Sequence, residues 1–177
     1  MKGKKLHSIQ GVTIRPTADR LRESIFNILS FRVHKAMVLD LFAGTGALGI
    51  EALSRGAESA VFVDNNPDAI AVIERNIKSC CFEKHAHIIR WDIKKKLNCL
   101  VPVGRAFNLV FLDPPYNRGM VKSALLNLEY TRSVEKGACI VVEHSHLEPI
   151  PDDLFIFEIA DQRRYGKTLV SFLTYVV

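Results

Sequence analysis

Apolar positions along the chain first follow a helical period and then form short runs. Leu21, Ile25, Ile28 and Leu29 recur at helical spacing and predict a helix over 17–30. Further on, apolar runs typical of strands lie at 37–42, 59–63, 87–90, 108–112, 138–142, 155–159 and 168–177. Helical patterns between several of these runs lie at 47–55, at 67–80 and from the residues after 112 to about 130.

Strands that alternate with helices predict an α/β fold with a mostly parallel seven-stranded sheet and right-handed crossovers. Only a short connection joins 155–159 to 168–177, which predicts a closing antiparallel strand pair. Ligands in such sheets bind beyond the carboxyl ends of the strands. The loops that follow four of the strands are therefore expected around one site, namely the loops after Phe42, Val63, Arg90 and Leu112.

The net charge of +5 is concentrated at one end of the chain. Residues 1–35 hold eight basic and two acidic residues, whereas the remainder holds 16 basic and 17 acidic residues. We therefore divide the chain into a basic N-terminal extension with a helix, 1–35, and an α/β domain, 36–177. A concentrated basic segment predicts a polyanion as partner. The residues expected to contact it are Lys4, Lys5, Arg15, Arg20 and Arg22.

Composition argues against several other classes of protein. No apolar run approaches the roughly 20 residues of a membrane-spanning helix, and no signal-peptide pattern follows the basic start, so we expect no membrane and a cytoplasmic location. The four cysteines lack zinc-type pairing and are expected to be reduced thiols. Two His-x-His pairs, at 85–87 and 144–146, have no third ligand nearby in sequence, so we predict no metal.

A glycine-rich loop follows the first predicted strand. Gly44, Gly46 and Gly49 match the G-x-G-x-x-G pattern of nucleotide cofactors, where glycine lets the backbone approach a ligand closely. About twenty residues later, Asp64 ends the second predicted strand, where a carboxylate can accept both hydroxyls of an adenosine ribose. This arrangement suits NAD and S-adenosylmethionine equally well.

Asp40 favours S-adenosylmethionine, because an acidic residue four positions before the first glycine is typical of that cofactor's loop. Its carboxylate would face the cationic end of the cofactor. Asp92 follows the third predicted strand, where such enzymes often contact the adenine amino group. Phe42 and Asn65, which adjoin the two loops, complete the set of expected cofactor-binding residues.

The most specific motif is Asp113-Pro114-Pro115-Tyr116, directly after the fourth predicted strand. An amino nitrogen conjugated to a base is a poor nucleophile, and an enzyme can activate it by accepting hydrogen bonds from its protons. The Asp113 carboxylate and the Pro114 carbonyl could accept them in a loop that two prolines keep rigid. Tyr116 offers a flat face on which an extruded base can stack. No cysteine lies in this loop, which argues against cytosine C5 methylation.

Together these motifs resemble the RsmD family of 16S ribosomal RNA guanine-N2 methyltransferases. The blocks that carry the resemblance are RPTADRLRESIFN at 15–27, DLFAGTGALGIEALSRG at 40–56, DPPY at 113–116 and RYGKT at 164–168. The resemblance implies a Rossmann-like class I S-adenosylmethionine methyltransferase fold. It also implies methyl transfer to a guanine N2 in 16S rRNA, with Gly44, Gly46 and Asp64 at the cofactor and Asp113 and Tyr116 at the base. The first hairpin of the family is expected to be shortened here.

Other functions share parts of this pattern. A DNA adenine or cytosine amino-methyltransferase or a protein glutamine-N5 methyltransferase uses a similar loop, although glutamine enzymes generally have asparagine in place of Asp113. An NAD-dependent oxidoreductase would need a catalytic Tyr-Lys or His-Asp set that is not recognisable here. A non-catalytic RNA-binding protein would not need an intact Asp113 loop. We expect the target RNA to be part of an assembled or partly assembled small ribosomal subunit.

Overall fold

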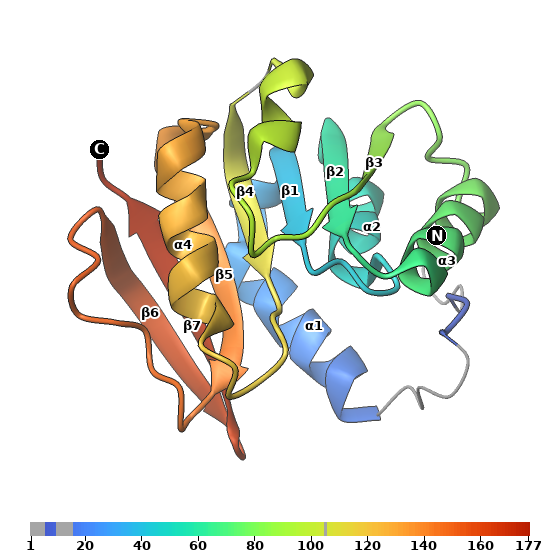
Figure 1. Cartoon of the computed structure of the whole chain (residues 1–177). Helices are drawn as coiled ribbons and strands as arrows, with labels where there is room; N and C mark the ends of the chain where they lie inside the picture. The colour runs from blue at the N-terminus through green and yellow to red at the C-terminus, as the bar shows by residue number, and fades with distance from the viewer. Residues whose placement is uncertain (1–5, 10–15, 105) are drawn as a thin grey trace.

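Seven strands form one sheet in the computed structural model of the chain, which describes residues 6–9, 16–104 and 106–177 (Figure 1). The strands are β1 Met37–Leu41, β2 Ser59–Asp64, β3 Ala86–Arg90, β4 Phe107–Leu112, β5 Val134–Ser145, β6 Phe157–Tyr165 and β7 Thr168–Tyr175. Their spatial order is β3-β2-β1-β4-β5-β7-β6. The first five strands run parallel, and β7 pairs antiparallel with both β5 and β6. The predicted α/β class and the closing antiparallel pair are confirmed.

Helices cover both faces of this sheet. The α-helices are α1 Pro16–Leu29, α2 Ala47–Ser54, α3 Pro67–Ser79 and α4 Met120–Thr131, and the short 3-10 helices are η1 Ser30–Val33 and η2 Asn98–Val103. One buried cluster joins α1, α2 and α3 to one face, and a second joins α4 and η2 to the other. In the part of the chain that the structure describes, no helix has the length and apolar character needed to cross a membrane.

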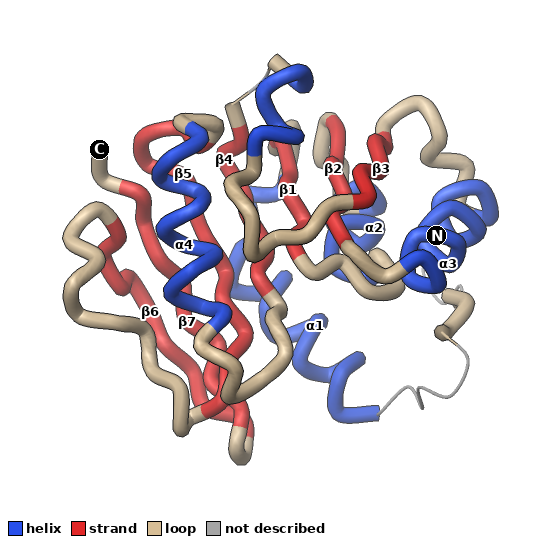
Figure 2. Tube along the Cα trace, viewed as in Figure 1, coloured by secondary structure: helices blue, strands red, loops and turns tan. Residues whose placement is uncertain are grey.

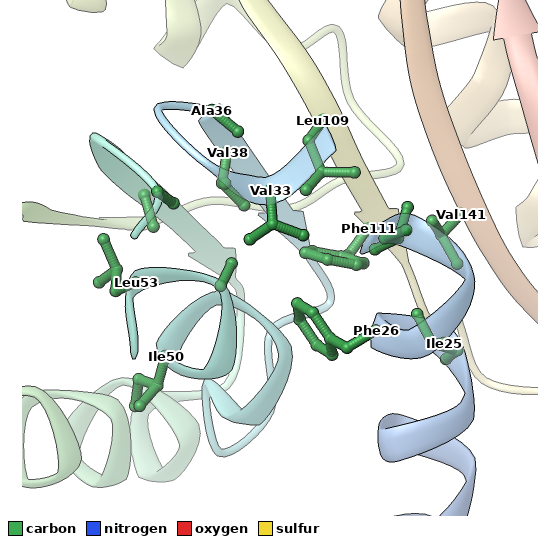
Figure 3. Packing of buried hydrophobic residues seen from close by; sticks show 14 of the residues in the cluster. Ile25, Phe26, Val33, Ala36, Val38, Ile50, Leu53, Leu109, Phe111 and Val141 are labelled. Atoms are coloured by element: carbon green, nitrogen blue, oxygen red, sulfur yellow. The ribbon is translucent and has the colours of Figure 1, made fainter. Parts of the chain in front are cut away.

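The helix predicted within the basic segment belongs to the core. Ile25 and Phe26 of α1 are buried against the sheet, and the ring of Phe26 lies 5.6 Å from that of Phe111 on β4 (Figure 3). Burying such side chains is worth about 1.5–3 kcal/mol each. The apolar stripe of α1 therefore fastens this helix to the α/β domain, while its polar residues face outward.

The carboxyl ends of the parallel strands meet at one edge of the molecule. The arrows of β1, β2 and β4 in Figure 1 point toward the same side, and Figure 2 shows the loops that follow these strands on that side. The first residues of α1 lie at the same edge in Figure 1. This edge is where ligands bind in open α/β sheets.

Candidate active site

Four carboxylate side chains lie at the C-terminal ends of four neighbouring parallel strands. Asp64 ends β2, Asp40 is the fourth residue of β1, Asp113 follows β4, and Glu143 lies near the end of β5. We call these residues the carboxylate row. Three of them were predicted from the sequence as site residues, whereas Glu143 was missed.

Strand geometry places the whole row on one face of the sheet. Side chains alternate between faces, so residues two apart share a face. The residues two positions before Asp64, Asp113 and Glu143 all belong to the cluster beneath α1, α2 and α3, and they are Phe62, Phe111 and Val141. Asp40 is the register partner of both Phe62 and Phe111. The Asp40 carboxylate therefore lies one step deeper on the same face.

The glycine loop leaves β1 in a strongly turned conformation. Phe42, Gly44 and Gly46 have φ angles of +60°, +56° and +76°, in the left-handed region that glycine tolerates best. Phe42 is not a glycine, so this backbone conformation costs conformational energy there. Strained residues of this kind often lie in functional loops. Gly46 is the N-cap of α2, and its N–H donates to the Ala43 carbonyl at 2.7 Å.

Asp64 holds this loop in place. One oxygen of its carboxylate accepts the Gly44 N–H at 2.9 Å, and the other accepts the Asn66 N–H at 2.9 Å. Asn65 lies between them at an exposed position. A carboxylate has about four acceptor positions, so Asp64 retains capacity for a ligand hydroxyl.

Asp40 is buried, with 2% of its surface exposed, and its Oδ2 accepts the Gly49 N–H at 2.9 Å. Burial raises the pKa of Asp40 to about 7, the hydrogen bond from Gly49 opposes this, and the charge of Asp64 adds to it. Gly49 cannot carry a side chain, because a Cβ there would lie 2.3 Å from the ring of Phe62. The third glycine of the motif is therefore required by the packing of α2 on β2.

The Asp113 loop lies beside the glycine loop. The N–H of Asp113 donates to the carbonyl of Leu41 at 3.5 Å, and Pro114 is buried. Asp113 is open to solvent on one side, yet the surrounding protein displaces enough water to raise its pKa well above the usual range. The charges of Glu143 and Asp40 raise this pKa further.

Tyr116 is oriented by its hydroxyl. The hydroxyl donates to Oε1 of Glu143 at 2.6 Å and lies 3.1 Å from Oγ1 of Thr168. Burial and the bond to Glu143 raise the pKa of Tyr116, so the phenol stays protonated. With 39% of its surface exposed, the residue leaves area on which a base could stack.

The remaining predicted site residues differ in their exposure and in their hydrogen-bond or ion-pair partners. Asp92 turns back on its own loop, where its carboxylate accepts the Lys94 N–H at 3.1 Å. Arg20 is exposed, whereas Arg22 is partly buried and pairs with Asp19 at 3.0 Å. The other three predicted RNA-binding residues, Lys4, Lys5 and Arg15, lie outside the described residues.

Asn76 of α3 is a second residue near the site that sequence patterns did not single out. Its side chain is fully buried and accepts the N–H of His7 at 2.7 Å, while its amide donates to the carbonyls of His7 and Thr45 at 3.1 and 2.9 Å. A single buried amide thus joins the N-terminal segment to the glycine loop. An asparagine on an amphipathic helix resembles an ordinary polar position, so its sequence context carried no signal.

Histidines of both His-x-His pairs have hydrogen-bond partners within the protein. His85 Nδ1 lies 3.0 Å from the Glu58 carbonyl, and His144 lies 2.8 Å from both the Glu148 carbonyl and Ser171 Oγ. Across residues 6–9, 16–104 and 106–177, no group of three or more His, Cys, Asp or Glu side chains could hold a metal ion.

Comparison with known proteins places the chain in a family. The family model described as "Conserved hypothetical protein 95" matches residues 1–174. The Bacillus subtilis protein named "Putative rRNA methyltransferase YlbH" is 36% identical over 170 residues, which cover 96% of this chain and 92% of that protein. "Ribosomal RNA small subunit methyltransferase D" of Escherichia coli K12 is 36% identical over 144 residues, or 80% of this chain and 70% of that protein.

A solved structure agrees with this placement. The structure titled "Putative methyltransferase yhhF from Escherichia coli" superposes with a TM-score of 0.85 at 29% identity, over 98% of this chain and 93% of that one. The predicted class I methyltransferase fold is confirmed, and the chain belongs to the Conserved hypothetical protein 95 family, the family of the RsmD methyltransferases.

Proposed function

We propose that this protein transfers a methyl group from S-adenosylmethionine to the exocyclic N2 of a guanine in 16S ribosomal RNA. The observation that carries the proposal is the adjacency of two loops. The glycine loop after β1 and the Asp113 loop after β4 leave neighbouring parallel strands, and the Asp113 N–H reaches the Leu41 carbonyl. A cofactor on the first loop would therefore lie next to the amine acceptors of the second.

The residues of the glycine loop fit S-adenosylmethionine. The cofactor carries a cationic sulfonium and amino group at one end and a ribose near the other. Asp40, with a pKa raised by burial, would gain from a nearby cation, and Asp64 has acceptor capacity for ribose hydroxyls. Bound S-adenosylmethionine supplies an electrophilic methyl group.

The Asp113 loop supplies the acceptors for the target amine. Methylation of an amino nitrogen releases one of its protons, and a carboxylate with a raised pKa is suited to hold that proton. The Pro114 carbonyl is the expected partner for the remaining N–H. The ring of Tyr116, oriented through Glu143, would stack on the base and hold the amine at this point.

The product nucleoside tests the proposal. The protein is incubated with labelled S-adenosylmethionine and small ribosomal subunits that lack the modification, and the RNA is digested and its nucleosides identified. We expect N2-methylguanosine in 16S rRNA. Asp113→Ala should lower kcat by roughly 10²–10³-fold while calorimetry shows nearly unchanged cofactor affinity. The exposed Asp152→Ala is the matched control. N6-methyladenosine as product, or normal turnover by Asp113→Ala, would contradict the proposal.

We infer that the substrate is a small-subunit particle, and that the protein meets it in the cytoplasm. Phosphate contacts from residues 1–35 position RNA without reading its sequence, so specificity must come from how the guanine is presented. We expect particles to be methylated faster than protein-free RNA. Replacing Lys4, Lys5, Arg20 and Arg22 with alanine should raise KM for RNA and flatten its salt dependence. Lys136→Ala is the control and should change neither, because Lys136 lies near the start of β5, at the other end of the strand from Glu143. Equal rates on particle and free RNA would refute the presentation argument.

A further inference from the structure

Glu143 lies next to Asp113 in the fold, although thirty positions separate them in the chain. Leu112 of β4 and Val142 of β5 are register partners in the parallel sheet. The residues that follow them, Asp113 and Glu143, therefore lie side by side on strands about 4.8 Å apart. The effect of the Glu143 charge on the pKa of Asp113 agrees with this proximity.

The Glu143 carboxylate has one oxygen engaged. Tyr116 donates its O–H to Oε1 at 2.6 Å, and no other hydrogen-bond donor reaches this carboxylate within the described part of the chain. The bond orients both partners, because Tyr116 is also close to Thr168 of β7. The second oxygen of Glu143 thus has an acceptor position in the same site as the Tyr116 ring and Asp113.

The ring nitrogen beside the reactive amine distinguishes guanine from the other amino bases. Guanine has an N–H at N1, next to its N2 amine, whereas adenine N1 and cytosine N3 are bare acceptors beside their amines. A carboxylate next to the amine acceptors would gain a charge-assisted hydrogen bond from guanine. The same carboxylate would face a lone pair of adenine or cytosine and repel it.

We propose that Glu143 is the residue that selects guanine, by accepting the N1–H while the Asp113 loop accepts the N2 amine. The inference rests on the proposed function, since it requires the base to stack at Tyr116 with its amine at Asp113. Two carboxylates side by side then match the two adjacent donors on the guanine edge. Stacking on Tyr116 alone would not discriminate among bases.

A purine that keeps the amine but loses the ring N–H provides the test. 2-Aminopurine has the same exocyclic amine at position 2, with a bare acceptor at N1. Small ribosomal subunits reconstituted with 16S rRNA that carries guanine or 2-aminopurine at the target are the substrates, and methyl transfer is measured in single-turnover reactions. The wild-type protein should methylate guanine at least about 10²-fold faster than 2-aminopurine. With 2-aminopurine, the Glu143 carboxylate faces the N1 lone pair and has no N–H to accept.

Glu143→Gln should reduce this preference at least tenfold, because an amide can accept from guanine N1–H or donate to 2-aminopurine N1. Cofactor affinity should stay unchanged by calorimetry, and Glu135→Gln, an exposed position on the same strand, should keep the wild-type preference. Tyr116→Phe separates selection from positioning, since it removes the hydroxyl and leaves the carboxylate.

Each outcome decides the inference. A reduced preference in Glu143→Gln but not in Tyr116→Phe supports it. An equal reduction in both variants shows that Glu143 acts only by positioning Tyr116, and overturns it. Equal wild-type rates on guanine and 2-aminopurine overturn the inference and leave the proposed function standing. Transfer to adenine in place of guanine overturns both.

Discussion

Replacing Asp40 with asparagine should change the dependence of stability on pH. Burial raises the pKa of Asp40 from 3.8 to about 7, so between these values the folded protein holds a proton that the unfolded chain has released. The stability that this carboxyl contributes is fully present below pH 4 and is lost as the pH rises to 7. Asp40→Asn has no such titration, because an amide stays neutral throughout.

The size of the effect follows from the shift. About three pKa units correspond to about 4 kcal/mol at 1.36 kcal/mol per unit. The free energy of unfolding of Asp40→Asn, relative to that of the wild type, should therefore rise by about 4 kcal/mol between pH 4 and pH 8. The asparagine Oδ1 can still accept the Gly49 N–H, so the comparison isolates the charge.

Urea unfolding of both proteins at several pH values measures this difference. Asp152→Asn removes an exposed acid and should follow the wild-type curve. Parallel curves for Asp40→Asn and the wild type would refute the reasoning, since they would show that Asp40 does not titrate in this range.

The protonation of the Asp40 carboxyl should also change when the cofactor binds. If a cation binds near Asp40, calorimetry in buffers of different ionisation enthalpy should detect release of a proton near pH 7, and Asp40→Asn should release less.

Two further predictions concern the scaffold of the glycine loop. Asn76→Ala should lower stability by about 1–3 kcal/mol and speed hydrogen exchange in residues 6–9, because three backbone groups lose their partner. Asn127→Ala, which loses one bond to the Ile93 carbonyl, is the control, and equal effects in urea unfolding would contradict this. Gly49→Ala should cost about 1–3 kcal/mol or more by overpacking against Phe62, and Phe62→Leu should recover part of that loss. Additive costs in the double variant would rule out the clash as the cause.

Most elements of the fold could be predicted from local pattern, but two strands were predicted too short. β5 was expected at 138–142 and spans Val134–Ser145, and β6 was expected at 155–159 and spans Phe157–Tyr165. Both carry exposed polar residues in the missed parts, so apolar periodicity ends before the strand does. Backbone pairing with β4 and β7 extends these strands beyond their apolar runs.

The site could be predicted where its residues belong to compact motifs. Asp40 lies within an apolar run, Asp64 and Asp113 each follow one, and the parallel topology brings these positions to the same end of the sheet. Glu143 and Asn76 could not be predicted in the same way. The position of Glu143 beside Asp113 depends on the register of β4 and β5, and Asn76 contacts a residue 69 positions away. The hydroxyl of Tyr116 likewise has a partner 27 positions away, so its role extends beyond stacking.

On the proposed function, the carboxylate row accounts for the excess of positive charge in residues 1–35. Asp64, Asp113 and Glu143 reach the surface there and Asp40 lies buried beneath them, so this end of the sheet attracts cations and hydrogen-bond donors. Such a surface would repel phosphate, so on the proposed function the backbone of the RNA would stay outside it. An extruded base carries no charge and presents its donors, so it can enter alone. On the proposed function, positive charge nearby would hold the phosphates, and α1, with Arg20 exposed, begins at the same end of the sheet (Figure 1). The separation of a basic segment from an acidic site thus matches a substrate whose backbone stays outside while one base reaches the cofactor.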